Sequence, residues 1–108
     1  MTLNRAGTDL SQHSLSAREW STVRLTKTAW GSLDELNQSD PSGFEAVAQA
    51  LVAFDAGQTV EHQHQKVKIQ GLSQTVYAVG SYRIYTSTEI EPGIVLVLGI
   101  LDVSGHAW

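Results

Sequence analysis

The spacing of apolar residues predicts two consecutive helices in the first half of the chain. Apolar side chains recur every three or four positions between residues 29 and 36, which predicts a first helix that is broken at residues 37–39. A second helix is expected to begin at Asp40 and Pro41, because aspartate can cap a helix and proline suits its first position. Gly57 is placed to end this helix in a left-handed conformation. The apolar stripe of the second helix comprises Phe44, Val47, Ala48 and Leu51.

The second half of the chain has the alternation and the residue types of β-strands. Apolar and polar residues alternate strictly at 66–70, which places Lys66 and Lys68 on the face opposite Val67 and Ile69. Turns are expected at Gly80-Ser81 and at Pro92-Gly93. The predicted strands cover residues 20–26, 66–70, 75–79, 82–88 and 94–101, the last of them a central strand.

This order of elements predicts the fold class. A β-α-α-β-β-β-β sequence is typical of an α+β fold in which two helices pack together on one face of a mostly antiparallel sheet. Residues 20–108 are expected to form this single domain, since 108 residues suffice for one core. Residues 1–19 are expected to form a loose arm or a short added helix, with capping-box spacing at residues 16–19.

Charge limits the surfaces that can bind phosphate. The net charge is −4, and residues 28–56 contain five acids and no base, whereas residues 57–83 contain three bases and one acid. A phosphate-binding surface is therefore expected only on the first strand and the middle hairpin. The chain has no cysteine and no apolar run approaching the roughly 20 residues of a membrane span. Together with the absence of a signal-like N-terminus, this favours a cytoplasmic protein without a membrane partner.

Two stretches resemble the RelE/ParE toxins of type II toxin-antitoxin pairs. They are VRLTKTAWGSLDEL, residues 23–36, and IQGLSQTVYAVGSYRIYTSTEIEPGIVLVLGI, residues 69–100. The most specific piece is VGSYRIY, residues 79–85, which is similar to the vG-x-YRI-Y hairpin of that family. The resemblance implies a prokaryotic toxin that either cleaves mRNA on the ribosome, as RelE-type members do, or inhibits DNA gyrase, as ParE-type members do. It also implies a cognate antitoxin that neutralises the toxin.

Candidate catalytic residues follow from the chemistry of RNA cleavage, which needs a base, an acid and a cation that stabilises phosphate charge. Arg83 stands at the arginine of the YRI motif, where the resemblance implies a phosphate-stabilising role. Tyr85 is expected on the same strand face as Arg83, whereas Tyr82 faces the core. His106 follows the last strand, where the family often carries a histidine or tyrosine acid-base group, and Trp108 can stack on a base.

Other polar residues invite weaker interpretations. Lys66 and Lys68 can bind substrate phosphates or simply form a solvated outer face. His62 and His64 would point the same way on a strand, as a shared metal ion would require, and either histidine alone is a candidate general base. No carboxylate follows them at a suitable spacing, so a polar loop is the favoured reading. No metal or cofactor is expected.

Three functional hypotheses therefore remain open. The first is a metal-independent, RelE-like endoribonuclease that uses Arg83, Tyr85 and His106. The second is a binding protein, either a ParE-like gyrase inhibitor or a degenerate toxin that retains only antitoxin binding. It is favoured by the acidic helices and by departures from the family pattern at residues 77–79 and 102–105, where ribonuclease members carry basic residues. The third is an unrelated ligand- or metal-binding protein. Under the first two, the antitoxin is expected to bind by a helix in a groove or by strand addition.

Overall fold

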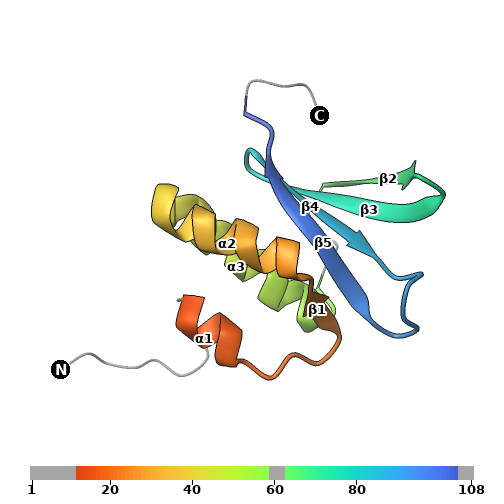
Figure 1. The fold of residues 1–108 in the computed structure, drawn as a ribbon, viewed down its shortest axis with the longest axis horizontal. Coiled ribbons are helices and arrows are strands. Elements are labelled where there is room, and N and C mark those ends of the chain that lie inside the picture. Colours follow the sequence, from red (N-terminus) through yellow and green to blue (C-terminus); the bar gives the residue numbers. More distant parts are fainter. Residues whose placement is uncertain (1–11, 59–62, 105–108) are drawn as a thin grey trace.

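The computed structural model of the chain describes residues 12–58 and 63–104. Three helices and five strands form a layer of helices beside a twisted sheet (Figure 1). The elements are α1 (Gln12–Ala17), β1 (Val23–Leu25), α2 (Lys27–Ser39), α3 (Pro41–Asp55), β2 (His64–Ile69), β3 (Leu72–Val79), β4 (Tyr82–Ser87) and β5 (Val95–Asp102). The predicted α+β class is therefore confirmed.

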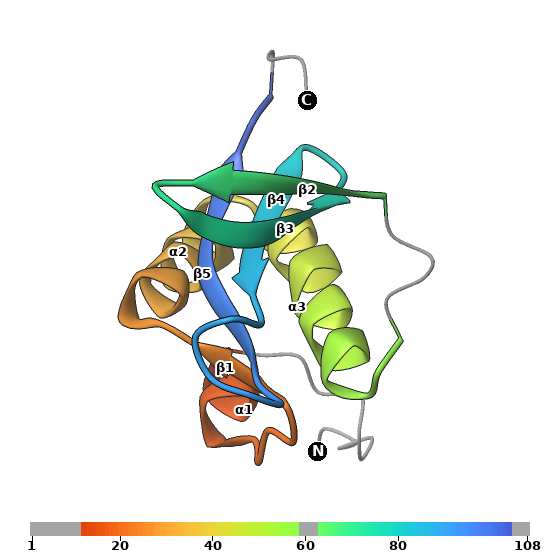
Figure 2. The same cartoon turned by 90° about the vertical axis from the view of Figure 1, so that its right-hand side faces the viewer.

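The five strands form one open sheet in the order β1-β5-β4-β3-β2. Strand β1 runs parallel to β5, and all other neighbours are antiparallel. The last strand, predicted to be central, lies between β1 and β4, so it is an interior strand, but the middle strand of the five is β4. Helices α2 and α3 lie on one face of this sheet, as Figures 1 and 2 show. We call the face turned away from these helices the open face.

Capping residues explain where the helices begin and end. Thr26 caps α2 by accepting a hydrogen bond from the backbone N–H of Ala29 at 3.1 Å. The break predicted at residues 37–39 was wrong, because α2 continues to Ser39, whose hydroxyl donates to the carbonyl of Glu35 at 3.0 Å. Asp40 then serves both helices. Its N–H donates to Leu36 of α2, and its carboxylate accepts from the N–H of Gly43 in α3.

The other predicted boundaries are mostly confirmed. Pro41 is the first residue of α3, and Gly57 has a φ of +82° directly after the helix cap. The capping-box spacing at residues 16–19 does not begin a helix, since α1 ends at Ala17. The turns at Gly80 and Gly93 are present, with φ values of +58° and +76°. A further turn was not predicted: Gln70 and Gly71, with φ values of +51° and +84°, join β2 to β3 as a two-residue hairpin.

The core lies between the helices and the covered face of the sheet. It combines apolar residues of α1, α2, α3, β1, β4 and β5, with Ile84 at the centre of the sheet entirely buried. Leu15 of α1 is 1% exposed and belongs to the same cluster, so α1 packs onto the domain. Among the least exposed side chains are Leu15, Val23, Leu33, Val47, Leu51, Ile84 and Val97.

Candidate functional site

Arg83 and Tyr85 lie together on the open face of β4, the middle strand of the sheet. Their neighbours Tyr82 and Ile84 belong to the buried core cluster, so the alternation places Arg83 and Tyr85 on the other side. The prediction that Tyr82 faces the core while Arg83 and Tyr85 share the opposite face is therefore confirmed. Both side chains are half-buried within the sheet surface. Residues on this face of a central strand are held by a ladder on each side, which makes it a rigid platform for chemistry.

Each residue of this pair has one small register partner and one larger aliphatic partner, which is Leu101 for Arg83 and Val76 for Tyr85. Ala78 of β3 is the register partner of Arg83, and Gly99 of β5 is the register partner of Tyr85. A Cβ atom added at Gly99 would have no heavy atom within 4 Å other than its chain neighbours. The sheet surface on the β5 side of Tyr85 is therefore not covered by another side chain at this point.

The guanidinium of Arg83 is held toward the turn that joins β3 to β4. Its Nη1 donates to the carbonyls of Gly80 and Tyr82, each at 3.0 Å. The C-terminal end of β5 lies beside this turn, since the N–H of Val103 donates to the carbonyl of Ser81 at 2.7 Å. The described chain thus reaches Ser104 at the Arg83 end of the sheet. His106 and Trp108, the other residues predicted for this site, lie outside the described residues.

Lys66 and Lys68 do not share a face with Arg83. In the ladder between β2 and β3, Lys66 pairs with Thr75, and His64 pairs with Tyr77. The ring of Tyr77 packs on Phe54 of α3 with centroids 4.5 Å apart, which identifies this as the helix side of the sheet. Alternation then places both lysines on the helix side and Arg83 on the open face. The structure therefore brings Arg83 and Tyr85 together but leaves the two lysines apart from them.

The lysines instead border a cavity of about 380 Å³. Strands β2 and β3 contribute Lys66, Lys68 and Thr75, and the segment after β4 contributes Thr88 and Glu89. The carboxylate of Glu89 accepts a hydrogen bond from the backbone N–H of Ser73 at 3.1 Å. Two cations, hydroxyl groups and one carboxylate therefore surround this space.

The predicted histidine pair is only half described. The ring of His64 contacts that of Tyr77, with centroids 5.6 Å apart, and His62 lies outside the described residues. Within residues 12–58 and 63–104, no cluster of three or more histidine, aspartate or glutamate side chains is arranged to hold a metal ion.

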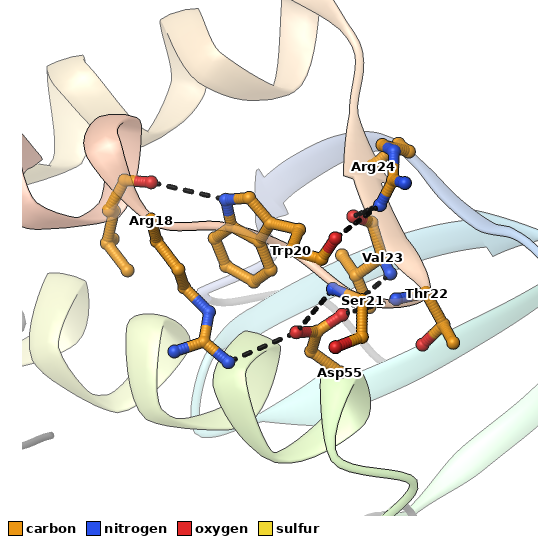
Figure 3. A network of polar contacts seen from close by, with 8 residues as sticks. Arg18, Trp20, Ser21, Thr22, Val23, Arg24 and Asp55 are labelled. Atoms are coloured by element: carbon orange, nitrogen blue, oxygen red, sulfur yellow. Dashed lines mark hydrogen bonds and ion pairs between the residues drawn. The ribbon is translucent and has the colours of Figure 1, made fainter.

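The most elaborate polar network of the described chain was not predicted, and it centres on Asp55 (Figure 3). Its carboxylate accepts hydrogen bonds from the backbone N–H groups of Ser21, Thr22 and Val23 at 3.0, 2.7 and 2.9 Å. It also pairs with the guanidinium of Arg18 at 3.1 Å. Burial alone would raise the pKa of this carboxyl, but the three N–H groups and Arg18 outweigh burial and lower the pKa to about 2.

This network has a structural role. It attaches the segment that precedes β1 to the C-terminal end of α3, where the partial negative charge of the helix disfavours an aspartate. An acid in the last turn of an apolar helix was the one sequence signal that such a partner exists. The guanidinium of Arg18 also lies 4.9 Å from the ring centroid of Trp20, which packs partly against the core.

A second unpredicted contact joins the start of β4 to the junction between α2 and α3. The hydroxyl of Tyr82 donates to the carboxylate of Asp40 at 2.7 Å. This bond, together with burial, raises the pKa of Tyr82 to about 12, and the same bond lowers the pKa of Asp40. Gly43 makes the arrangement possible, because a Cβ atom there would collide with both side chains.

No protein-family model matches the chain, and no curated protein matches it in sequence. Among the described helices, none is both long enough and apolar enough to cross a membrane.

Proposed function

We propose that this chain is a RelE/ParE-type toxin that acts as an endoribonuclease on mRNA through its open face. The observation that carries the proposal is the placement of Arg83 and Tyr85 on the same face of the middle strand, with Ala78 beside Arg83 and Gly99 beside Tyr85. The two helices on one face of a mostly antiparallel sheet are compatible with the architecture that the resemblance implies. The chain is expected to act in the cytoplasm and to be neutralised there by a cognate antitoxin.

The chemistry requires no metal and no cofactor, because the 2′-hydroxyl of the RNA is the nucleophile. Arg83 would stabilise the charge that develops on the phosphate oxygens, since a guanidinium binds two of these oxygens at once and stays protonated. Tyr85 stands two residues from Arg83 on the same face of β4 and would stack on a base or protonate the leaving oxygen. His106 and Trp108 keep the acid-base and stacking roles predicted from the sequence.

Incorporation of labelled methionine in bacteria after induction of the chain tests this proposal. The Arg83→Ala substitution is expected to restore protein synthesis at matched expression, because loss of one preorganised charge-stabilising group typically lowers the rate by about 10²–10³-fold. Arg83→Lys should restore it partly, since lysine keeps the charge but not the planar fork.

Arg24→Ala is the matched control. Arg24 is exposed and its register partner is Leu96, whereas that of Arg83 is Leu101, so the control removes the same charge from another part of the sheet. Synthesis should still collapse in this variant. Equal toxicity of Arg83→Ala and the unaltered chain would exclude the proposed chemistry.

A second candidate is favoured by the separation of the lysines from Arg83. A ribonuclease surface usually gathers several cations around the scissile phosphate, but here Lys66 and Lys68 lie on the other side of the sheet. A ParE-like gyrase inhibitor, or a degenerate toxin that only binds an antitoxin, needs no such cluster. Purified chain that inhibits supercoiling by DNA gyrase, and that leaves mRNA intact, would support the gyrase version.

A further inference from the structure

The cavity bordered by Lys66 and Lys68 is separate from the Arg83 face. Its volume is about 380 Å³, within the range of about 300–1,000 Å³ that is typical of small-molecule sites. Strands β2 and β3 and the segment after β4 line it, mainly with lysine, serine, threonine and glutamate side chains. Because its lysines stand on the helix side of the sheet, a ligand held by them would not contact Arg83 or Tyr85. The proposed chemistry at Arg83 therefore does not use this space.

Four polar side chains form a square on the helix side of β2 and β3. In the register of the ladder, Lys66 lies opposite Thr75, and Lys68 lies opposite Ser73. Residues directly opposite each other have Cβ atoms about 5 Å apart, and alternate residues of one strand are about 6.5 Å apart. Two ammonium groups and two hydroxyl groups can therefore donate to the same small anion.

These donors are not used elsewhere in the described part of the chain. Among the described residues, neither Lys66 nor Lys68 takes part in an ion pair or a side-chain hydrogen bond. The hydroxyls of Ser73 and Thr75 likewise make no hydrogen bond to another described residue. All four groups line the cavity, so they remain available to a ligand.

Buried hydroxyls of β4 hold the strand that carries Ser73 and Thr75. The hydroxyl of Thr86 donates to the carbonyl of Thr75 at 2.9 Å, and the hydroxyl of Ser87 donates to the carbonyl of Ser73 at 3.0 Å. Both donors are only 2% exposed. These bonds add to the ladder between β3 and β4 and fix the backbone beneath the cavity. A site held in this way loses less conformational entropy when a ligand binds.

Glu89 borders the cavity and limits what can bind there. Its carboxylate accepts a hydrogen bond from the backbone N–H of Ser73 at 3.1 Å, and its own N–H donates to the hydroxyl of Ser87 at 3.2 Å. The carboxylate is therefore held in place, and it retains capacity to accept a further hydrogen bond from a ligand hydroxyl. A chain of phosphodiesters crossing the cavity would bring further negative charge toward Glu89, so a polyanion suits the site poorly.

We propose that this cavity binds the phosphate monoester of a small hydroxylated molecule, either a sugar phosphate or a mononucleotide. The phosphate would accept hydrogen bonds from Lys66 and Lys68, and from the hydroxyls of Ser73 and Thr75. A hydroxyl of the ligand would donate to Glu89. Lysine binds phosphate as a point charge, whereas arginine is better matched to a planar carboxylate. A phosphate monoester also carries close to two negative charges at neutral pH, which two lysines balance.

The first experiment titrates the full chain, isotope-labelled for amide NMR, with ribose 5-phosphate. The amide signals of Lys66, Lys68, Ser73 and Thr75 should shift in a saturable way, because their side chains surround the phosphate. Ribose alone should cause no such shift. Dimethyl phosphate, a diester with a single negative charge, should bind at least about tenfold more weakly, because it forms fewer charge-assisted hydrogen bonds.

A titration with AMP distinguishes the two sources of the phosphate monoester. Equal Kd values for AMP and ribose 5-phosphate would assign the site to sugar phosphates, since the base then adds no contact. A lower Kd for AMP would assign it to nucleotides. Either result supports the proposal, provided that the same four amide signals shift.

Substitution of the lysines tests their role. Lys66→Gln and Lys68→Gln should each raise the Kd for ribose 5-phosphate about tenfold, because each removes one charge-assisted hydrogen bond. Lys27→Gln removes the same charge from an exposed residue of α2 and should leave the Kd unchanged. Arg83→Ala should also leave it unchanged, so failure of the ribonuclease proposal and failure of this one are distinguishable. Unaltered amide signals in the helices confirm that each variant is folded.

Glu89→Gln tests the contact with the ligand hydroxyl. Glutamine keeps an oxygen that can accept from the N–H of Ser73 but removes the negative charge. Inorganic phosphate should therefore bind more tightly to this variant, whereas the advantage of ribose 5-phosphate over inorganic phosphate should become smaller. An equal improvement for both ligands would contradict a hydroxyl contact at Glu89.

Two outcomes would overturn the proposal as a whole. One is a titration in which ribose 5-phosphate leaves the four amide signals unmoved, or binds equally well to both lysine variants. The other is displacement of ribose 5-phosphate by a short 2′-O-methyl RNA that has a 5′-hydroxyl and binds more tightly at Lys66 and Lys68. Such an RNA resists cleavage and has no phosphate monoester, so this result would assign the lysines to a nucleic-acid backbone.

Discussion

The two ends of the sheet differ in how deeply their side chains are buried. Strands β1, β5 and β4 carry Val23, Val97 and Ile84, all 0% exposed, beneath α2 and α3. Strand β2, at the other end, has no buried residue, and within residues 12–58 and 63–104 it pairs with β3 alone. The free energy of folding is therefore concentrated in the first region. The second region is free to carry surface chemistry, since a change there disturbs little of the core.

The largest expected effect on stability comes from shortening a buried aliphatic side chain, compared with the same kind of change in β2. Ile84→Ala is expected to lower the free energy of unfolding by about 4 kcal/mol, because it leaves a cavity in the centre of the core. Val67→Ala in β2 should lower it by less than about 1 kcal/mol, because Val67 is only partly buried. Urea denaturation of both variants measures the difference. Similar losses would mean that β2 is as important to stability as the covered strands.

A slightly smaller effect is expected at Asp55, which joins the N-terminal segment to the covered region. Asp55→Ala should lower the free energy of unfolding by about 3 kcal/mol, since it deprives three backbone N–H groups and Arg18 of their acceptor. Glu45→Ala, which removes an exposed acid from the same helix, should change it by less than about 0.5 kcal/mol. Equal losses in the same urea experiment would argue against the network.

The depressed pKa of Asp55 also predicts an acid-sensitive part of the stability. Its pKa falls from 3.8 to about 2 on folding, so ionised Asp55 stabilises the fold above about pH 4. This contribution, about 2 kcal/mol, should disappear as the pH falls from about 4 to about 2. Asp55→Asn should be less stable at neutral pH and should lose less stability over this interval. Parallel stability curves for the two proteins would contradict the assignment.

Sequence periodicity predicted the covered region better than the contacts that hold it together. The stripe from Phe44 to Leu51 and the alternation around Ile84 are local patterns, and each directly reflects one buried face. The partners of Asp55 lie 32 to 37 residues away, and no local pattern reveals such a contact. Helix α2 continues through residues 37–39 because exposed polar residues can be accommodated in the last turn of a helix that Asp40 caps.

The part of the candidate site that lies within one strand was predictable from local alternation. The part that depends on pairing between strands was not. Alternation within one strand placed Arg83 and Tyr85 on a common face, which the register confirms. Whether Lys66 and Lys68 shared that face depended on the pairing of β2 with β3, and a shift of one residue would have reversed the answer. The hairpin turn at Gln70 and Gly71 sets this register, and it was not recognised in the sequence.

The smallest test uses the two tyrosines of β4, one on each face. Tyr82→Phe removes the hydroxyl that donates to Asp40, so we expect the melting temperature to fall by a few degrees. Tyr85→Phe should leave it unchanged, since the hydroxyl of Tyr85 makes no hydrogen bond within the described part of the chain. In the methionine-incorporation assay the order should reverse, with Tyr85→Phe weakening the toxin and Tyr82→Phe preserving it. If one substitution changed both readouts, the covered and open faces of β4 would not act independently. Reversal of the order between the two assays would instead separate the residue that supports the fold from the one that serves the site.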